Sequence, residues 1–263
     1  MLRFPRAATA ETARAAFDQA DLNLTPSRAT SASAVSSPGL LPYVDEEVSP
    51  LDPIVAVGAL LLSVGPLWRL LGNHVLTLVH ESGHAVTAVA VGSIWVRVRI
   101  YANGSGDTES TGTTNGVLGS LAGFTAPSLV GLVLLWAADQ LPPAPVLVGC
   151  LGFLLAMALL MIRSAFGALL ALGMASSTAL TYLYASTWGQ RTAISICAWL
   201  LLVGAVRNTL SLAKVKEDDD DDAANLEESA GLPRGFWVWF FLVFSLAALL
   251  LAIWGTLGFP TSL

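Results

Sequence analysis

Residues 74–92 read HVLTLVHESGHAVTAVAVG, and they indicate both the kind of fold and the kind of chemistry to expect. Most of these positions are apolar, and the run is close to the length of about 20 residues that a helix needs to cross a bilayer. Four ionisable residues nevertheless lie within it, namely His74 at its start and His80, Glu81 and His84 in its interior. Because such residues are costly inside a membrane, they usually serve a function. The stretch therefore predicts a membrane helix that carries a functional site.

The composition of the whole chain extends this prediction. Hydrophobic residues make up 54% of the 263 residues, charged residues make up only 12%, and the mean hydropathy is +0.67. A soluble domain carries about 25% charged residues, because its surface must be wetted. These values exclude a soluble enzyme, a nucleic-acid-binding protein and a disordered chain. The expected fold class is an all-α polytopic membrane protein, with the lipid bilayer as its surroundings and no nucleic acid as a partner.

Runs without charge predict about seven transmembrane helices in the membrane-embedded domain, residues 51–263. The predicted spans are 53–71, 74–92, 116–137, 144–162, 166–187, 192–212 and 235–257. The fifth span is rich in glycine, serine and threonine, which is typical of a helix packed inside a bundle.

The first 50 residues differ from the rest in being rich in Ala, Ser, Thr and Pro, and this composition predicts a disordered tail. With seven spans, 11 of the 13 Lys and Arg residues fall on the side of the membrane that holds this tail. The positive-inside rule places that side in the cytoplasm. We therefore expect a multi-pass protein of the cell membrane, with its N-terminus in the cytoplasm and its C-terminus outside. Residues 99–110 and 217–228 should then be cytoplasmic loops.

His80, Glu81 and His84 form the pattern H-E-x-x-H. Residues four apart on a helix differ by about 40° around its axis, so the two imidazoles project from one face. They can occupy adjacent corners of a zinc site, and Glu81 can then accept a proton from a water that attacks a peptide carbonyl. The alternative is structural polarity without a metal, which the cost of placing these groups in a membrane disfavours. His74 lies about 240° further round the helix, so we expect it at the outer interface.

The sequence HESGHA at 80–85, within a hydrophobic helix, resembles the site-2 protease class of intramembrane zinc metallopeptidases, and more closely its B-like bacterial branch. The similarity extends over roughly residues 70–257. It implies a zinc-dependent intramembrane endopeptidase that cleaves a membrane-anchored protein in or near the transmembrane span of that substrate, in regulated intramembrane proteolysis. The cofactor would be Zn²⁺, with His80 and His84 as ligands and Glu81 as the catalytic residue.

A short amphipathic β segment is expected after the motif helix. Residues 94–101 alternate apolar and polar side chains, which is the periodicity of a strand, and a glycine-rich turn follows at 103–108. The resemblance implies such a strand near the active site, where an extended substrate could pair with its edge. The alternative is a loop hairpin without a role in substrate binding, since pairing needs an open strand edge.

Residues 122–127 read AGFTAP, which resembles the A-G-x-x-x-P of the same branch. Gly123 would permit close packing of helices, and Pro127 would permit a kink. Both roles are expected to be structural. The polarity of the third and fifth spans could admit water to the metal.

The third protein ligand is less directly indicated. Site-2 proteases usually take it from an aspartate within an N-P-x-D-G type sequence, which this chain lacks. The B-like branch tends to carry Asp-Ala-x-x-Leu before its last span, and residues 222–226, DAANL, match that pattern. We predict Asp222 as the ligand, because the expected topology brings its loop to the same side of the membrane as His84. Asp107 is the competitor, and a solvated acidic loop without a metal role is the other alternative.

Two other functions compete with proteolysis. A non-catalytic metal-binding regulator or scaffold, derived from such a protease, would result if the third ligand were missing. A transporter with an H-E-x-x-H metal site is the weaker alternative. Transporters usually show internal repeats with broken helices in paired positions, and the sequence shows no such pairing.

Overall fold

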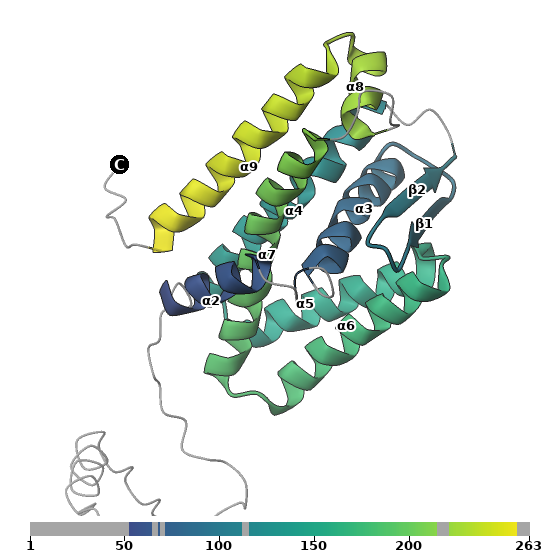
Figure 1. Cartoon of the computed structure of the whole chain (residues 1–263). Coiled ribbons are helices and arrows are strands. Elements are labelled where there is room, and N and C mark those ends of the chain that lie inside the picture. The colour runs from purple at the N-terminus through teal and green to yellow at the C-terminus, as the bar shows by residue number, and fades with distance from the viewer. Residues whose placement is uncertain (1–52, 65–67, 69–71, 112–115, 215–220, 257–263) are drawn as a thin grey trace, which may run out of the picture. The chain divides into compact units, whose positions relative to one another are not determined.

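Figure 1 shows a computed structural model of the chain, in which residues 53–64, 68, 72–111, 116–214 and 221–256 are described. The predicted tail, residues 1–50, lies outside the described residues. The described part is mostly helical, with one small antiparallel sheet, as the composition predicts. In chain order the elements are α2 (Pro53–Val64), α3 (Asn73–Ala90), β1 (Val96–Ile100), β2 (Gly106–Ser110), α4 (Gly116–Gln140), α5 (Pro143–Ala156), the π-helical turn η2 (Met157–Met161), α6 (Ala165–Tyr184), α7 (Thr187–Leu212), α8 (Asp222–Ala230) and α9 (Arg234–Thr256).

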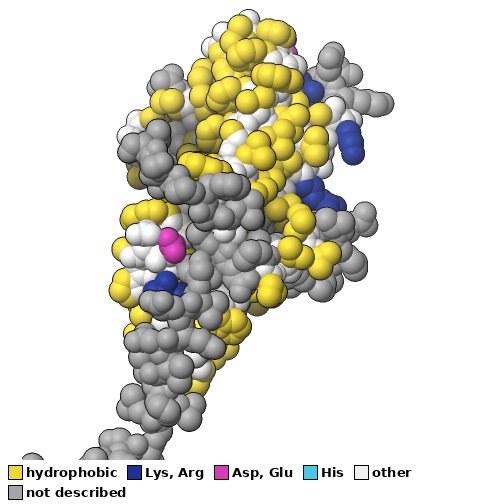
Figure 2. Space-filling view, turned by 90° about the vertical axis from the view of Figure 1, so that its left-hand side faces the viewer, with side chains coloured by type: hydrophobic (Ala, Val, Ile, Leu, Met, Phe, Trp, Pro, Cys, Tyr) yellow, Lys and Arg dark blue, Asp and Glu magenta, His cyan; other side chains and the backbone are white. Residues whose placement is uncertain are grey.

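Five helical segments among the described residues are long and apolar enough to cross a membrane. They are α4, α5 continued by η2, α6, α7 and α9. The described part of α2 has only 12 residues, and α3, with 18, carries the ionisable motif. Each of the seven predicted spans contains a helix, but the count of seven is not confirmed. On the face shown in Figure 2, most described side chains are hydrophobic and few are charged, as a lipid-facing surface requires.

The prediction that the fifth span packs inside the bundle is wrong. Only 17% of the apolar window of α6 is buried, compared with 50% of the window of α7, which is the most buried of the five. The hydroxyl groups of α6 explain the difference. Thr178 donates to the carbonyl of Met174, and Thr181 donates to the carbonyl of Ser177, each four residues earlier. Since these donors are satisfied within the helix, they need no neighbouring helix to bond them.

Helix α3 lies in the middle of the bundle, between α4 on one side and the β1–β2 hairpin on the other (Figure 1). A glycine of the motif permits the close approach of α4. A Cβ atom at Gly83 would lie 2.5 Å from the carbonyl oxygen of Ala122 in α4. The two helices therefore pack backbone to backbone at this point, which fixes their separation beside the motif.

The predicted β segment is a complete hairpin, in which β1 pairs antiparallel with β2 and Val98 faces Thr108. The strand is shorter than predicted, and the predicted turn at 103–108 is partly wrong, because its last three residues begin β2. The apolar residues of β1 at positions 96, 98 and 100 are buried, as the alternation predicts. The tip of the hairpin lies beside the first turns of α3, where Asn73 and Thr77 both donate to the carbonyl of Gly104, at 3.3 and 2.7 Å.

The acidic stretch before the last span is also more ordered than predicted. Asp222 begins helix α8 and does not lie in a loop, so the predicted loop at 217–228 is wrong for residues 222–228. Asp221 caps this helix, since its side chain accepts a hydrogen bond from the backbone N–H of Ala224. Two apolar side chains in α8, Ala223 and Leu226, are fully buried against α4, α7 and α9. This amphipathic pattern, hidden among the acidic residues, attaches α8 to the bundle.

Candidate metal centre

Three side chains from two distant parts of the chain converge beside α3. The Nε2 atoms of His80 and His84 are 3.2 Å apart. The Oδ2 atom of Asp222 lies 3.1 Å from Nε2 of His80 and 3.2 Å from Nε2 of His84. Within the described residues, this is the one group of three potential ligand side chains close enough to share a metal ion. The sequence placed the two histidines on one face, and the tertiary fold adds the aspartate.

The spacing of these donors suits zinc. A tetrahedral zinc ion with bonds of about 2.0–2.2 Å holds adjacent ligand atoms about 3.3–3.6 Å apart. The three distances between the donor atoms, 3.1–3.2 Å, are only slightly shorter. Two imidazoles and one carboxylate are also a donor set that catalytic zinc sites use, with one position left for water or substrate. The residues present therefore fit a catalytic zinc site.

The charges at this site favour an ionised Asp222. Burial opposes ionisation, but the hydrogen bonds from His80 and His84 outweigh it and hold the pKa of Asp222 below the usual value of an aspartate. An ionised carboxylate is the form that binds a metal, so this environment prepares the side chain as a ligand.

A glycine of α4 leaves room for the imidazole of His84. A Cβ atom at Gly123 would lie 2.3 Å from Nε2 of His84 and 2.6 Å from its Cε1. The neighbouring Phe124 packs edge-on against the ring of His80, with the ring centroids 4.9 Å apart. The predicted role of Gly123 was helix packing alone, and the structure adds that the residue lines the position of a candidate metal ligand. The AGFTAP sequence thus shapes the wall of the site.

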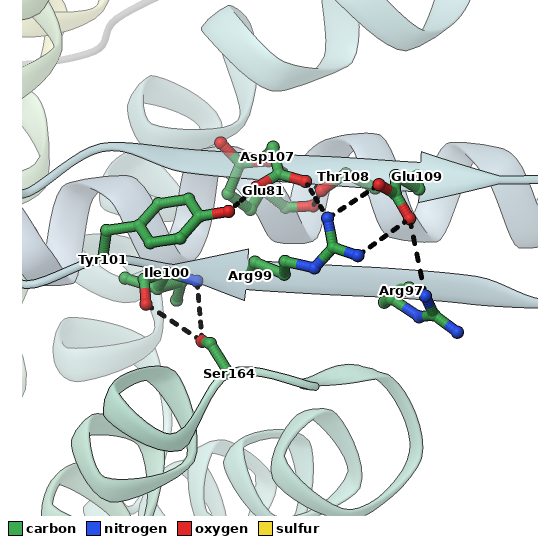
Figure 3. A network of polar contacts seen from close by, with 9 residues as sticks. All are labelled: Glu81, Arg97, Arg99, Ile100, Tyr101, Asp107, Thr108, Glu109 and Ser164. Atoms are coloured by element: carbon green, nitrogen blue, oxygen red, sulfur yellow. Dashed lines mark hydrogen bonds and ion pairs between the residues drawn. The ribbon is translucent and has the colours of Figure 1, made fainter.

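Glu81 is held by the hairpin. The residue is 5% exposed, and its Oε2 accepts a hydrogen bond of 2.6 Å from the hydroxyl of Thr108 in β2 (Figure 3). A Cβ atom at Gly106, two residues before Thr108 in β2, would lie 2.8 Å from both Cγ and Oε1 of Glu81. Gly106 and Thr108 therefore fix where this carboxylate points. Neither residue was predicted from the sequence to act at the site, although the alternation of side chains along a strand would have placed both on one face.

Asp107, the competitor for the third ligand, is not brought to the histidines. Its carboxylate accepts a hydrogen bond of 2.7 Å from the hydroxyl of Tyr101 and lies 3.4 Å from NH1 of Arg99, on the other face of the hairpin (Figure 3). His74 is 8% exposed, and its ring packs edge-on against Phe166, so the residue is buried in the bundle. Its place at the outer interface of the membrane stays a prediction.

The candidate ligands and Glu81 line a common cavity of about 680 Å³. Its wall also includes Gly106, Thr108 and Ser110 of β2, Ser120 and Phe124 of α4, Asn208 of α7, and Asn225 and Ser229 of α8. The third predicted span, α4, therefore contributes to this cavity, as expected for a route by which water enters. No described residue of α6, the fifth span, is part of the wall.

The model of the family described as Peptidase M50B-like matches residues 53–252, which include α2, the motif helix, the hairpin and most of α9. The chain belongs to the peptidase M50B-like family. This is a site-2 protease family, so the resemblance inferred from HESGHA and DAANL is confirmed at the family level. No curated protein and no solved structure matches the chain.

Membership of the M50B-like family and the apolar helices together indicate a multi-pass membrane protein of an intramembrane metalloprotease family. The non-catalytic alternative depended on a missing third ligand, and the described residues supply a third donor beside the two histidines. That alternative is therefore not favoured. The side of the membrane on which each terminus lies stays a prediction.

Proposed function

We propose that this M50B-like protein is a zinc-dependent endopeptidase that cleaves a membrane-anchored protein in or near its transmembrane span. In this proposal His80, His84 and Asp222 hold the zinc ion, and Glu81 is the catalytic residue. The observation that carries it is the meeting of three zinc-type donors in one cavity with a buried carboxylate. The cytoplasmic N-terminus, the outward C-terminus and a role in regulated intramembrane proteolysis belong to the same proposal.

Glu81 performs the proton transfers of the reaction. Bound zinc supplies Lewis-acid chemistry, which activates water and polarises the peptide carbonyl. The carboxylate of Glu81 accepts a proton from the attacking water and later donates it to the departing amine. The hydrogen bond from Thr108 occupies one carboxylate oxygen, Oε2, which leaves Oε1 for the proton. Burial of this side chain keeps bulk water away from the transfer.

The substrate backbone pairs with the outer edge of β2. The backbone N–H of Tyr101 donates to the carbonyl of Ser105, and that of Thr111 donates to the carbonyl of Trp95. These two bonds fix which residues of each strand bond to the other strand. By this alternation the backbone groups of β2 residues 106, 108 and 110 point away from β1. No backbone bond to these groups is found among the described residues, and all three residues line the cavity of the candidate zinc site.

The outer edge of β1 is not open in the same way. Arg163 donates from its backbone N–H to the carbonyl of Val98, and Ser164 uses its hydroxyl to bond both the N–H and the carbonyl of Ile100 (Figure 3). An extended peptide that adds a strand to this hairpin therefore finds its free backbone groups on β2. Since a helical substrate span shields its peptide bonds, pairing with β2 would also hold an unwound segment in the extended form that cleavage needs.

The test is to separate metal binding from catalysis in purified protein and in cells. Glu81→Gln is nearly isosteric and cannot accept the proton, so it should bind zinc normally and lose cleavage. His80→Ala and Asp222→Ala should lose zinc affinity together with cleavage, because each removes a ligand. Asp107→Ala is the matched control, because it also removes an acidic side chain near the cavity. The carboxylate of Asp107 is paired with Arg99, so this variant should keep its zinc affinity.

The substrate is sought in cells that carry Glu81→Gln, as a membrane protein that accumulates uncut. Cleavage by Glu81→Gln within tenfold of the wild type would remove Glu81 from the base role. Zinc affinity unchanged in Asp222→Ala would remove that residue from the metal site. Stoichiometric zinc in the purified wild type without cleavage of any membrane protein would favour the regulator instead.

A further inference from the structure

Two neighbouring aspartates at the start of α8 have different environments. Asp222 faces the histidines, whereas the side chain of Asp221 turns to Arg234, the first residue of α9. NH2 of Arg234 donates to Oδ2 of Asp221 at 2.6 Å, and Nε donates to the same oxygen at 3.0 Å. Oδ1 of Asp221 meanwhile caps α8 through the N–H of Ala224 at 2.9 Å. One carboxylate therefore holds both the start of α8 and the start of α9.

Arg234 also reaches a third helix. Its NH2 group donates to the carbonyl of Leu212, the last residue of α7, at 3.1 Å, and its backbone N–H donates to Glu227 of α8 at 3.0 Å. The residue is only 9% exposed. The first turn of a helix is electropositive and disfavours a cation, whereas the last turn of α7 is electronegative. The position of this arginine therefore does not serve α9 itself, and its charge is compensated by Asp221 and by the end of α7.

We propose that the Asp221–Arg234 ion pair positions Asp222 as the third zinc ligand. Asp222 is covalently adjacent to Asp221, so a fixed Asp221 sets where the first helical residue of α8 lies relative to His80 and His84. The pair also assigns the two carboxylates their tasks. Arg234 and the N–H of Ala224 together occupy the oxygens of Asp221, so Asp222 is left as the carboxylate with an oxygen directed at the histidines.

The arginine also balances charge at this place. Two adjacent, largely buried carboxylates repel each other unless each is compensated. With Arg234 on Asp221, the negative charge that remains is the one that the metal itself would neutralise. Asp221 and Arg234 are thus positioning residues and are not among the three candidate metal ligands. This inference rests on the proposed zinc site.

The experiment measures zinc affinity in purified full-length variants by competition with a chromophoric chelator. Asp221→Asn keeps a side-chain cap on α8, because asparagine caps as well as aspartate, but it loses the charge that Arg234 pairs with. Arg234→Gln removes the cation. Arg234→Lys keeps the charge but lacks the planar guanidinium that bonds both the carboxylate of Asp221 and the carbonyl of Leu212. We expect Asp221→Asn and Arg234→Gln to weaken zinc binding about 10–100-fold, the usual effect of removing a group that orients a ligand, with Arg234→Lys between them and the wild type.

Three further measurements separate positioning from general stability. The double variant of Asp221→Asn and Arg234→Gln should lose no more zinc affinity than whichever single variant binds zinc less tightly, because the two residues act as one unit. The visible spectrum of Co²⁺ bound in place of zinc should change in all three single variants, since it reports on ligand geometry. Glu227→Ala is the control, because it removes another α8–α9 contact without touching Asp221, and it should keep the affinity within threefold.

The outcomes distinguish the possible failures. If Asp222→Ala and His80→Ala leave zinc affinity unchanged, the zinc site itself is misassigned. If those two variants lose zinc but Asp221→Asn and Arg234→Gln bind it like the wild type, with the same Co²⁺ spectrum, the positioning role is overturned and the zinc site stands. A loss in Glu227→Ala as large as in Arg234→Gln would also overturn it, since any loosening of α8 would then suffice.

Discussion

Gly123→Ala should weaken zinc binding by at least 100-fold, although residue 123 is not one of the candidate ligands. The added methyl group would lie 2.3 Å from Nε2 of His84, the atom that would bond the zinc. Ordinary contact begins at about 3.4 Å, so the imidazole would have to move by about 1.1 Å. Moving α4 away from α3 to avoid this would break the close backbone packing of Gly83 against Ala122.

The expected magnitude follows from the tolerance of a zinc site. Metal–ligand distances hold within about 0.2 Å, so a displacement near 1.1 Å removes His84 from coordination. We expect zinc affinity to fall by at least 100-fold, above the range for a lost orienting group, and cleavage to disappear with it. Alanine itself favours a helix over glycine by about 1 kcal/mol, so the helix should not be weakened.

Gly119→Ala is the matched control, one turn earlier on α4. There the nearest atom to the added methyl group would be Nδ1 of His84 at 4.0 Å, an ordinary contact. Zinc affinity is measured by chelator competition in both variants, and folding is checked by thermal unfolding without metal. The reasoning fails if folded Gly123→Ala binds zinc within threefold of Gly119→Ala, because His84 would then accept the methyl group without leaving the site.

Three further predictions concern the hairpin and the topology. Thr108→Val removes the 2.6 Å hydrogen bond to Glu81 and should lower kcat about 10–100-fold in a cleavage assay, with zinc affinity unchanged; an unaltered kcat would show that the carboxylate needs no such support. Gly106→Ala places a methyl group 2.8 Å from Oε1 of Glu81 and should likewise spare zinc but stop cleavage, so retained cleavage would contradict the proposed pose. In a background without the two native cysteines, a membrane-impermeant thiol reagent applied to whole cells should label Leu141→Cys and not Glu228→Cys, and the reverse pattern would invert the predicted orientation.

Part of the site was predictable from local sequence because local geometry decides it. The spacing of His80 and His84 places both imidazoles on one helix face, whatever surrounds that helix. Local periodicity likewise predicted strand β1, and the apolar positions of the alternating pattern are the buried ones in the structure. The helix α8 escaped prediction because its two buried apolar residues, Ala223 and Leu226, stand among charged neighbours that read as a solvated loop. How deeply a helix is buried in the bundle could not be predicted from its composition either. The threonine hydroxyls of α6 suggested a buried helix, but they bond to carbonyls of the same helix and need no neighbour.

The sequence by itself determined that this is a membrane protein with an H-E-x-x-H helix, because composition sets the solvent a chain can tolerate and helical spacing sets which side chains share a face. Only the tertiary structure shows that Asp222, and not Asp107, lies beside the two histidines. Both are aspartates in acidic or polar stretches outside the expected spans, and residue type alone gives them the same chemistry. Packing of α8 against α4 and α9 brings Asp222 to the histidines, whereas strand pairing turns Asp107 toward Arg99. A ligand set drawn from distant segments depends on how helices pack, and that information lies in long-range contacts that no local pattern records.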